Sequence, residues 1–476
     1  MKKKLPLIIL ATGLVFFILM LTNNFSAPFF SMRLFGTLYA NMWENLLNWN
    51  FTIDPKYCHS ECFINFEKKA FIAYFGLMPA FFRGLFAPFL DIYKVGLSNL
   101  GMVLGFIISF SFLTGTLKKL GLLKNKLGYF LLVALVFSSP ITFLFTWGWI
   151  YHEVILWGFV WTMISLSIFL SWTLGKKREQ NLLNGTLLGL AVGLAVLSRP
   201  SSALTVLIPY AILCAISFTE FLKTKKGSFK KLLPGTVLAL FCAFLVIAGN
   251  VEKWGEPFTF VRMDRHVQLM KNVRGEAIVE HGHSNLNRVP HALLYYFVPS
   301  GDNFKAEFPF VRLDEKLDIM NSAPHFDYIE GSRLPMILSS LYLFVFGILG
   351  LWHFRKLPKK GWLGTVLVGG TFTLITLSSI YCVALRYSAD LTAFLIFANI
   401  LFLLAVKEKK VKLPKYLPQI LIIFSILLSV AMVLVYKSWV WDVPPKTRLN
   451  IMNFFNEKVE EGKYKFMING EKLKTF

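Results

Sequence analysis

Residues 154–174 read VILWGFVWTMISLSIFLSWTL, a run without a charged side chain, and Gly-Lys-Lys-Arg follows directly at 175–178. A helix rises about 1.5 Å per residue, so a run of this length matches the roughly 30 Å hydrocarbon core of a bilayer. Within lipid a helix satisfies its own backbone hydrogen bonds, and Lys and Arg gather at the cytoplasmic ends of spans. The stretch therefore predicts a transmembrane helix whose carboxyl end faces the cytoplasm.

Ten more apolar runs of at least 17 residues are spread along the chain. They lie at 5–22, 96–117, 127–146, 182–198, 203–222, 232–250, 335–353, 361–380, 389–406 and 416–436. The 476 residues are 55% hydrophobic and 16% charged, with a mean hydropathy of +0.57, whereas soluble chains carry about 25% charged residues. This composition excludes a soluble globular, a disordered and a fibrous protein. We expect an all-α polytopic membrane protein with about eleven transmembrane helices in residues 1–436.

Basic residues alternate between the two sides of the predicted helices. Short loops on one side hold 24 of the 50 Lys and Arg with three acids, whereas the other side holds 26 basic and 24 acidic residues. The basic loops are those around 2–4, 118–126, 176–178, 223–231, 355–360 and 407–415. Because short basic loops stay in the cytoplasm, we expect the N-terminus inside and the C-terminus outside, which an odd number of spans requires. The formal charge of +23 thus reports topology, and no basic face interleaved with aromatics predicts nucleic-acid binding.

The first apolar run has two interpretations. Three lysines precede it and the small residues Ser26 and Ala27 follow it, as in a secretory signal peptide. The run is longer than the usual apolar region of about 7–15 residues in such peptides. We therefore favour an uncleaved membrane anchor.

The predicted outer segments are large and the cytoplasmic loops are small. Residues 23–95 and 251–334 form two long outer loops, and 437–476 form an exterior tail. No cytoplasmic loop is long enough for a domain. Any chemistry of this protein is therefore expected at the outer face or within the bilayer close to it.

The first outer loop contains an apolar, aromatic stretch at 70–90, which Gly76, Pro79, Gly84 and Pro88 interrupt. A further crossing there would reverse the later alternation of charge. We expect a helix lying in the membrane interface. A loop that only caps the helix bundle is an equal alternative.

Asp54 is the acid of this loop to which we give most weight. A carboxylate just above the bilayer, under an apolar roof, can act as a general base. The structural alternative is a turn or helix N-cap, since Pro55 follows directly. Both interpretations remain open at this point.

Other ionisable residues lie at the outer ends of predicted spans. His152 and Glu153 open the fourth span, where they could pair, line a polar cavity or form an ordinary turn. Arg199 follows the fifth span, where an arginine is disfavoured by the positive-inside rule; it suits bidentate phosphate binding or snorkelling to headgroups. Arg386 and Asp390 are four apart and could pair on one helix face.

The residues by themselves predict no metal site. The histidines of the second outer loop lack metal-ligand spacing, no Asp-x-Asp occurs, and the five cysteines suggest no cysteine chemistry.

Several motifs together resemble a known family. They are Asp54-Pro55, Tyr74-Phe75-Gly76 with Pro79 and Arg83, Tyr151-His152-Glu153 with Trp157-Gly158, Leu197-Ser198-Arg199-Pro200, Asn250 with Trp254-Gly255-Glu256-Pro257, and Arg386-Tyr387 with Asp390. In order and location the sequence is similar to bacterial integral-membrane glycosyltransferases of the GT-C fold. The motifs are short, and together they extend from residue 50 to residue 390.

The resemblance implies transfer of a sugar from a polyprenyl-phosphate donor to a glycan, lipid or protein acceptor at the outer face of the cytoplasmic membrane. It implies a first-loop carboxylate that activates the acceptor or positions a divalent cation, and no other cofactor. Asp54 matches by position, with Glu44, Glu61 and Glu67 as rivals.

The remaining motif residues take their roles from the same resemblance. His152 and Glu153 belong beside Asp54 at the catalytic site, and Arg199 and Arg386 would hold the donor phosphate. Tyr74, Arg83 and Asp390 would contact substrate.

Two other classes of protein compete with this interpretation. A lipid or polysaccharide transporter, including a flippase, would need ionisable groups along a path within the spans. Here such groups stop at the span ends. A structural subunit explains the composition but not the gathering of His152, Glu153, Arg199 and Arg386 at one face.

Overall fold

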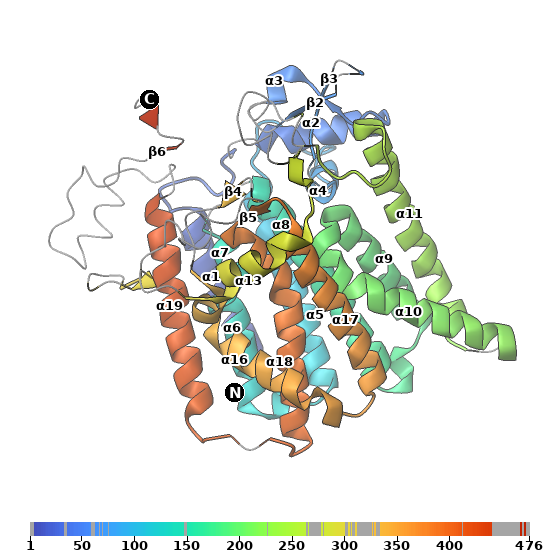
Figure 1. Cartoon of the computed structure of the whole chain (residues 1–476), viewed down its shortest axis with the longest axis vertical. Helices are drawn as coiled ribbons and strands as arrows, with labels where there is room; N and C mark the ends of the chain where they lie inside the picture. Colours follow the sequence, from blue (N-terminus) through green and yellow to red (C-terminus); the bar gives the residue numbers. More distant parts are fainter. Residues whose placement is uncertain are drawn as a thin grey trace.

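The computed structural model confirms an all-α polytopic membrane protein, shown in Figure 1. It describes residues 4–439 except 33–35, 59–61, 66, 69, 75, 147–149, 226, 263–264, 266–277, 279, 300–302, 305, 307–309, 312–325, 327, 330–333 and 412, and in the tail only 467–468 and 471–472. Long helices stand side by side, the N-terminus lies at their lower end, and small helices and strands gather at their upper end.

All eleven predicted runs coincide with apolar helices. In the described residues eight are long and apolar enough to cross a membrane: α5 (Ser98–Lys119), α6 (Lys126–Phe137) with α7 (Pro140–Leu144), α8 (Ile150–Leu174), α10 (Pro200–Thr224), α11 (Phe229–Trp254), α17 (Lys360–Ser379), η8 (Leu385–Leu391) with α18 (Thr392–Lys407), and α19 (Leu417–Trp439). Three shorter helices occupy the other positions: α1 (Leu5–Leu21), α9 (Leu182–Ser198) and α16 (Leu341–His353).

Prolines break or begin several of these helices. Pro140 lacks the N–H that would continue α6, so a new short helix starts there behind two serines. Pro200 is the first residue of α10, where its missing N–H costs nothing. The chain therefore turns sharply at Arg199, between α9 and α10, and this turn lies at the upper end of the bundle.

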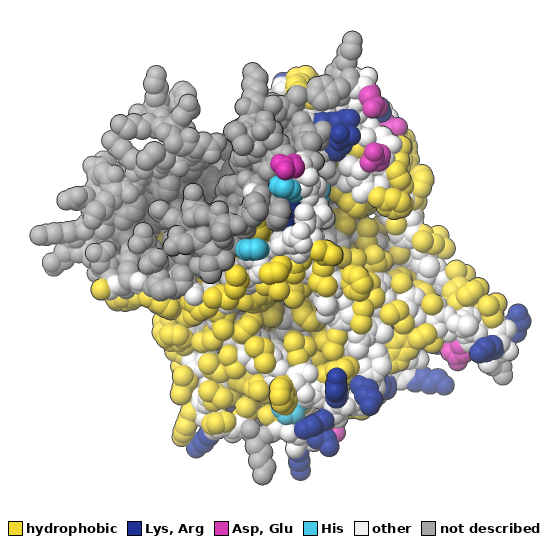
Figure 2. Space-filling model, viewed as in Figure 1, with side chains coloured by type: hydrophobic (Ala, Val, Ile, Leu, Met, Phe, Trp, Pro, Cys, Tyr) yellow, Lys and Arg dark blue, Asp and Glu magenta, His cyan; other side chains and the backbone are white. Residues whose placement is uncertain are grey.

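The loops rich in Lys and Arg meet at one end of the bundle, which we call the basic end. In Figure 2 Lys and Arg lie along the lower edge of a broad hydrophobic belt. Polar contacts join these loops: Lys119 to Glu179 at 2.5 Å, Lys231 Nζ to the Gln180 carbonyl at 2.6 Å, and Lys407 Nζ to the Leu120 carbonyl at 2.9 Å. The gathering of these loops agrees with the predicted alternation of charge, while the assignment of this end to the cytoplasm stays a prediction.

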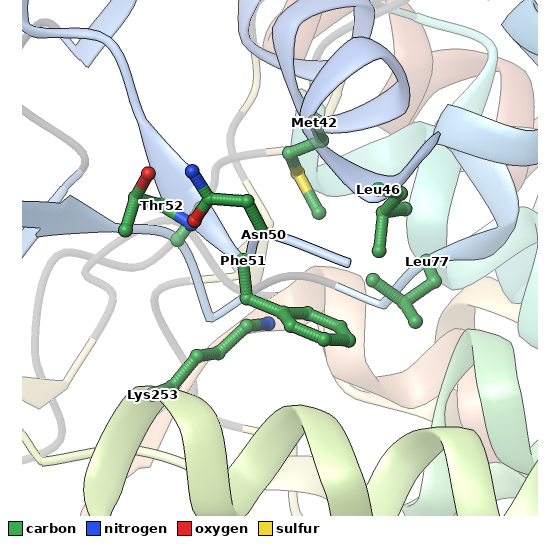
Figure 3. A pocket seen from close by; sticks show the side chains of 8 residues that line it. Met42, Leu46, Asn50, Phe51, Thr52, Leu77 and Lys253 are labelled. Carbon is green, nitrogen blue, oxygen red and sulfur yellow. The ribbon is translucent and has the colours of Figure 1, made fainter. Parts of the chain in front are cut away.

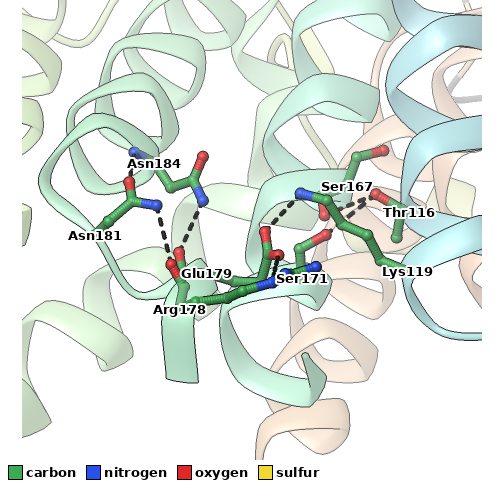
Figure 4. Close-up of polar contacts among 8 residues, drawn as sticks. All are labelled: Thr116, Lys119, Ser167, Ser171, Arg178, Glu179, Asn181 and Asn184. Carbon is green, nitrogen blue, oxygen red and sulfur yellow. Dashed lines mark hydrogen bonds and ion pairs between the residues drawn. The ribbon is translucent and has the colours of Figure 1, made fainter. Parts of the chain in front are cut away.

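Figure 4 shows how α5, α8 and α9 are tied together there. The Thr116 hydroxyl donates to the Ser167 carbonyl at 3.0 Å, and Asn184 Nδ2 donates to the Glu179 carbonyl at 2.8 Å. The ammonium of Lys119 holds the pKa of the Glu179 carboxyl below its ordinary value. The short 3₁₀ helices η2 (Leu122–Lys124), η3 (Lys177–Glu179) and η7 (Phe354–Lys356) turn the chain at the same end.

Gly185, Gly189 and Gly193 recur every four residues, a spacing that predicts close helix packing. In the structure these glycines let α9 and α11 approach closely. A Cβ on Gly189 would lie 2.2 Å from the Gly235 carbonyl carbon, so any larger side chain would force the helices apart. This contact fixes the direction in which α11 rises to the upper end.

The first outer loop folds into a small layer at the upper end, which we call the outer end. It contains α2 (Gly36–Leu47), β1 (Thr52–Ile53), α3 (Pro55–Cys58), β2 (Phe63–Asn65), β3 (Ala70–Ile72) and α4 (Met78–Gly84). The strands form an antiparallel sheet in the order β1-β3-β2, with Thr52 and Phe63 both opposite Ile72. A disulfide joins Cys58 and Cys62.

The predicted helix over 70–90 is therefore only part of that stretch. Residues 70–72 are a strand, α4 begins at Met78 with Pro79 in its first turn, and turns follow after Gly84. Gly76 explains the break, because a Cβ there would lie 1.9 Å from the Ser198 carbonyl oxygen. The chain must pass this backbone closely before the helix can start.

The described parts of the second outer loop cover the same end. They include η5 (Leu286–Arg288), α13 (Val289–Phe297) and β4 (Tyr328–Ile329), and β4 pairs in parallel with β5 (Cys382–Val383). The short helix α15 (Met336–Ser339) follows this loop and begins the apolar run that continues in α16. Buried Arg288 donates to the carbonyls of Gly282, His283 and Ser379, which holds this loop on α17. His266, a histidine of this loop, lies outside the described residues, and so does most of the tail 437–476. Two short strands of the tail are described, β6 (Met467–Ile468) and β7 (Glu471–Lys472).

Candidate functional site

A sealed ion pair joins the first outer loop to the bundle. Arg83, in α4, donates from Nη1 to Glu153 Oε1 at 2.8 Å and from Nη2 to Oε2 at 3.0 Å. Nη2 also donates to Ser98 Oγ, and Nη1 to the Pro79 carbonyl, both at 2.9 Å. The two charged side chains are 2% and 0% exposed. Such a two-pronged, fully hydrogen-bonded pair fixes α4 against α5 and α8.

Tyr39 of α2 completes the surroundings of this pair. The Arg83 guanidinium lies 4.9 Å from the centre of the Tyr39 ring, and the tyrosine hydroxyl donates to the Ile150 carbonyl at 2.9 Å. Burial raises the pKa of the Tyr39 hydroxyl well above its ordinary value. The hydroxyl therefore stays protonated and can keep donating. Arg83, expected at the substrate, is thus placed inside the protein.

A second arginine–carboxylate pair lies nearby and is more open. Arg199 Nε lies 2.5 Å from Asp390 Oδ2, and the side chains are 19% and 0% exposed. The spacing of four residues suggested that Asp390 pairs with Arg386. In the structure Asp390 pairs with Arg199 instead. The reason is local geometry: residues 385–391 form a 3₁₀ helix, with three residues per turn, so positions i and i+4 do not share a face.

Two guanidinium groups converge on the ring of Tyr387. The Arg199 guanidinium lies 4.9 Å from its centre and that of Arg386 lies 5.2 Å from it. Arg386 also lies 5.0 Å from the centre of the Tyr151 ring, at the start of α8. We call Arg199, Arg386, Asp390, Tyr151 and Tyr387 the arginine cluster. It joins the α9–α10 turn, α8 and η8 at the outer end.

Tyr74 lies next to the arginine cluster. Tyr74 and Tyr387 both pack against the apolar group around Phe63 and Trp254, and the Tyr74 and Phe63 rings are 5.2 Å apart. Three residues later the chain is anchored, since the Leu77 amide donates to the Leu197 carbonyl at 3.0 Å. The segment around Tyr74 is thereby held against the turn that carries Arg199.

His152 and Glu153 are neighbours in sequence but face different surroundings. His152 Nδ1 lies 3.1 Å from the Leu144 carbonyl, and its ring packs on Phe143. The side chain is 1% exposed. Adjacent helix residues point about 100° apart, so Glu153 turns to Arg83 while His152 links α8 to α7.

Asp54 lies apart from the arginine cluster in the described contacts. Its carboxylate is 42% exposed and lies 3.3 Å from Lys56 Nζ, at the residue that precedes α3. The hydrogen bond to the Asp54 carboxylate raises the pKa of the Lys56 ammonium. The structure therefore brings Arg199, Arg386, Asp390 and Tyr74 together, and leaves Asp54 at the accessible surface of the outer layer.

A polar network connects Asp54 with Glu44. The Asp54 amide donates to Asn41 Oδ1 at 2.9 Å, and Asn41 Nδ2 donates to the Tyr93 hydroxyl at 3.4 Å. That hydroxyl donates to Glu44 Oε2 at 2.5 Å. Burial, and then the Glu44 hydrogen bond, raise the pKa of Tyr93. Two of the first-loop acids thus belong to one surface.

Sequence reasoning assigned no role to Tyr39, Ser98 or Lys253. Nothing in the local pattern marks Ser98 or Tyr39, because their partners are distant in sequence. Lys253 carried a usable signal, since a lysine at the outer end of a span breaks the positive-inside rule just as Arg199 does. In the described residues no group of three His, Cys, Asp or Glu could hold a metal ion.

Two solved structures are similar to this chain. The apo crystal structure of the Archaeoglobus fulgidus oligosaccharyltransferase matches with 11% identity and a TM-score of 0.49, over 100% of this chain and 61% of that one. The oligosaccharyltransferase AglB of the same organism, in complex with an inhibitory peptide and a dolichol-phosphate, matches with 12% identity and a TM-score of 0.46, over 92% of this chain and 56% of that one. This chain thus spans less than two thirds of either archaeal protein. No protein-family model and no curated protein match the sequence.

Proposed function

We propose that the protein is a membrane glycosyltransferase, which moves a sugar from a polyprenyl-phosphate donor to an acceptor at the outer face of the cytoplasmic membrane. One observation carries the proposal: the guanidinium groups of Arg199 and Arg386 converge on the Tyr387 ring at the end of the bundle opposite the basic loops. Two arginines held together beside the membrane are suited to an anion with several oxygens.

The arginine cluster would hold the donor phosphate. A polyprenyl tail stays in the bilayer and presents its phosphate at headgroup level, where the outer ends of α8 and α10 lie. When the bond between the sugar and the phosphate breaks, negative charge grows on the leaving phosphate. Arg199 and Arg386 would stabilise that charge, and Asp390, buried behind Arg199, would fix the direction of its guanidinium.

Asp54 remains the proposed base for the acceptor hydroxyl. Its carboxylate is exposed enough to meet a soluble or lipid-borne acceptor, and its partner Lys56 is a surface residue. The acceptor hydroxyl would lose its proton to Asp54 while its oxygen bonds to the sugar carbon. Glu44 is the alternative base, because the network through Asn41 and Tyr93 places it on the same surface.

The other predicted site residues would act by position. Glu153 and Arg83 hold the first outer loop on the bundle, and His152 fixes the start of α8. Tyr74, in the first outer loop, lies next to the arginine cluster, where it would contact the sugar or the phosphate. A glycan, a lipid or a protein fits the acceptor role equally well on these contacts.

The transporter alternative is less well supported by the charges. In the described spans the carboxylates of the two arginine pairs, Glu153 and Asp390, lie near the outer ends of α8 and of η8 with α18. The lysines that bond between the loops, Lys119, Lys231 and Lys407, lie at the basic end. A path for a charged substrate would need such groups deeper in the membrane. Chemistry at the outer face needs them where they are.

Transfer of a radiolabelled sugar tests the proposal. Membranes with the full chain would be incubated with a radiolabelled polyprenyl-phosphate sugar, and label would be followed into lipid, glycan and protein fractions. We expect transfer that depends on the protein and is lost in Arg199→Ala. Movement of intact donor between leaflets, without transfer of its sugar, would support the transporter instead.

A further inference from the structure

Lys253 is buried at the outer end of α11 without a carboxylate partner. Its side chain is 6% exposed, and among the described residues no Asp or Glu lies within ion-pair distance of it. The preceding Glu252 pairs with Lys68 instead. A buried ammonium has lost its hydration, and proteins normally compensate this loss with an opposing charge. The missing charge points to an anionic ligand.

The ammonium points into a shallow pocket that the first outer loop completes. Figure 3 shows the Lys253 side chain extending from α11 towards Phe51 and Asn50. Its Nζ lies 5.8 Å from the centre of the Phe51 ring. The other lining residues are Met42, Leu46, Thr52, Ala73 and Leu77. The pocket thus offers one positive charge, an amide and a hydroxyl among apolar walls, which suits the charged end of an amphiphile.

A purely structural account of Lys253 is weaker. The residue lies in the last turn of α11, where the helix dipole favours a cation. The carbonyl of Lys253 is already engaged, since Asn65 Nδ2 donates to it at 3.0 Å. The dipole stabilises a cation far less than complete burial destabilises it. The dipole therefore explains why a lysine is tolerated there, and leaves most of the burial cost without compensation.

A stripe of exposed apolar residues on α11 extends along the helix towards Lys253. Its exposed apolar residues are Val237, Leu240, Phe241, Phe244, Ile247 and Val251. They recur every three or four positions and therefore share one face of the helix. The stripe ends two residues before Lys253, and the exposed Leu47 and Trp49 precede the pocket residue Asn50. Lys253 accordingly lies where lipid headgroups meet the outer layer.

We propose that the Lys253 pocket binds the phosphate of an anionic membrane lipid. The phosphate would dock at the open side of the pocket against the Lys253 ammonium, with Asn50 and Thr52 as hydrogen-bond partners, and the acyl chains would follow the α11 stripe. This site is separate from the arginine cluster, because none of the five residues of that cluster lines the pocket. The proposal does not require that the protein transfers sugar.

Thermal unfolding of the purified full chain tests the proposal. The unfolding midpoint would be measured in detergent alone and after addition of phosphatidylglycerol, phosphatidylcholine or inorganic phosphate, and native mass spectrometry would count retained lipids. We expect phosphatidylglycerol to raise the midpoint by about 2 °C or more and to be retained as one bound molecule. Lys253→Met should remove both effects, because it deletes the charge and fills the same space. Lys94→Met is the matched control, since it removes an 84% exposed lysine of the same loop layer.

The comparison of phosphatidylglycerol with inorganic phosphate distinguishes a lipid headgroup from free phosphate as the ligand. A shift with phosphatidylglycerol alone assigns a lipid headgroup, whereas an equal shift with inorganic phosphate assigns a site for phosphate that needs no tail. The proposal is overturned if Lys253→Met responds like the unchanged protein, or if phosphatidylcholine stabilises as well as phosphatidylglycerol. Equal stabilisation of the wild-type protein by both lipids overturns the proposal even if the variant does not fold. Sugar transfer is not measured, so a negative result leaves the proposed function standing.

Discussion

Two arginine–carboxylate pairs lie at the outer end of this protein and differ in access to solvent. Arg83 and Glu153 are sealed, with four hydrogen bonds on the guanidinium and 2% and 0% exposure. Arg199 keeps 19% exposure against a buried Asp390, and its guanidinium shares a tyrosine ring with Arg386. In the sealed pair the Arg83 donors already have partners within the protein, so few remain for a ligand. In the more exposed pair Asp390 fixes the orientation of the Arg199 guanidinium, part of which stays accessible.

The difference teaches that burial decides the role of an arginine more than sequence context does. Both arginines lie in motifs that suggest substrate binding. Arg83 instead joins three helices, because a carboxylate and a serine take up its donors. Arg199 has an anchored face and an open face, and that combination suits binding of phosphate.

The largest effect is expected from breaking the sealed pair. Glu153→Gln keeps the shape but leaves the Arg83 guanidinium buried without an opposing charge, which should cost about 3–5 kcal/mol of folding free energy. Thermal unfolding of purified protein would measure it. The double variant Arg83→Met with Glu153→Gln should be less destabilised than the two single variants added together. Unchanged stability of Glu153→Gln would show that the pair does not hold the loop.

The next effect concerns the base in the outer layer. Asp54→Asn should lower turnover by about 10²–10⁴-fold, the usual contribution of general base catalysis, and should leave folding intact because the side chain is 42% exposed. Initial rates of sugar transfer would measure it. Glu44→Gln is the matched variant. A loss in Glu44→Gln with full activity in Asp54→Asn would transfer the role to Glu44.

A smaller effect is expected from a substitution in the arginine cluster. Arg386→Lys keeps the charge but loses the planar two-pronged contact, so turnover should fall by about 10–100-fold with little change in stability. The control is Arg178→Lys, an arginine 77% exposed at the basic end. Equal rates for Arg386→Lys and the unchanged protein would leave Arg386 without a role in phosphate binding.

The smallest effect lies outside both pairs, at His283 in the second outer loop. Burial, and then the charge of Arg288, lower the pKa of His283 to about 4, against an ordinary value of about 6.5. The unfolded chain therefore binds this proton more readily, and stability should fall as pH drops from about 6.5 towards 4. Unfolding midpoints across this range should vary less in His283→Gln. An unchanged pH dependence in that variant would exclude His283 as its source.

The positions of the spans could be predicted from the sequence for a simple physical reason. A bilayer demands an uncharged run of fixed length, and each of the eleven runs coincides with an apolar helix. The close approach of α9 and α11 was predictable too, because glycines four apart leave room for only another backbone.

The partners within the site could not be predicted in the same way. Arg83 finds Glu153 from 70 residues away, and Arg199 finds Asp390 from 191 residues away. Such pairs depend on how helices pack, which local periodicity does not encode. The 3₁₀ helix at 385–391 and the small sheet of the first outer loop were missed because both are short. The sequence placed Arg199 and Arg386 at one face correctly. It also placed His152 and Glu153 beside Asp54, whereas in the structure Glu153 pairs with Arg83, His152 contacts α7, and Asp54 pairs with Lys56.

Binding of a polyprenyl phosphate is the measurement that tests the central claim most directly. The purified full chain, Arg199→Lys, Arg386→Lys and the control Arg178→Lys would be titrated with a radiolabelled polyprenyl phosphate in detergent. The account predicts saturable binding that is about tenfold or more weaker in both cluster variants and unchanged in the control. Equal affinity in all four proteins would contradict it, because Arg199 and Arg386 would then not hold the phosphate.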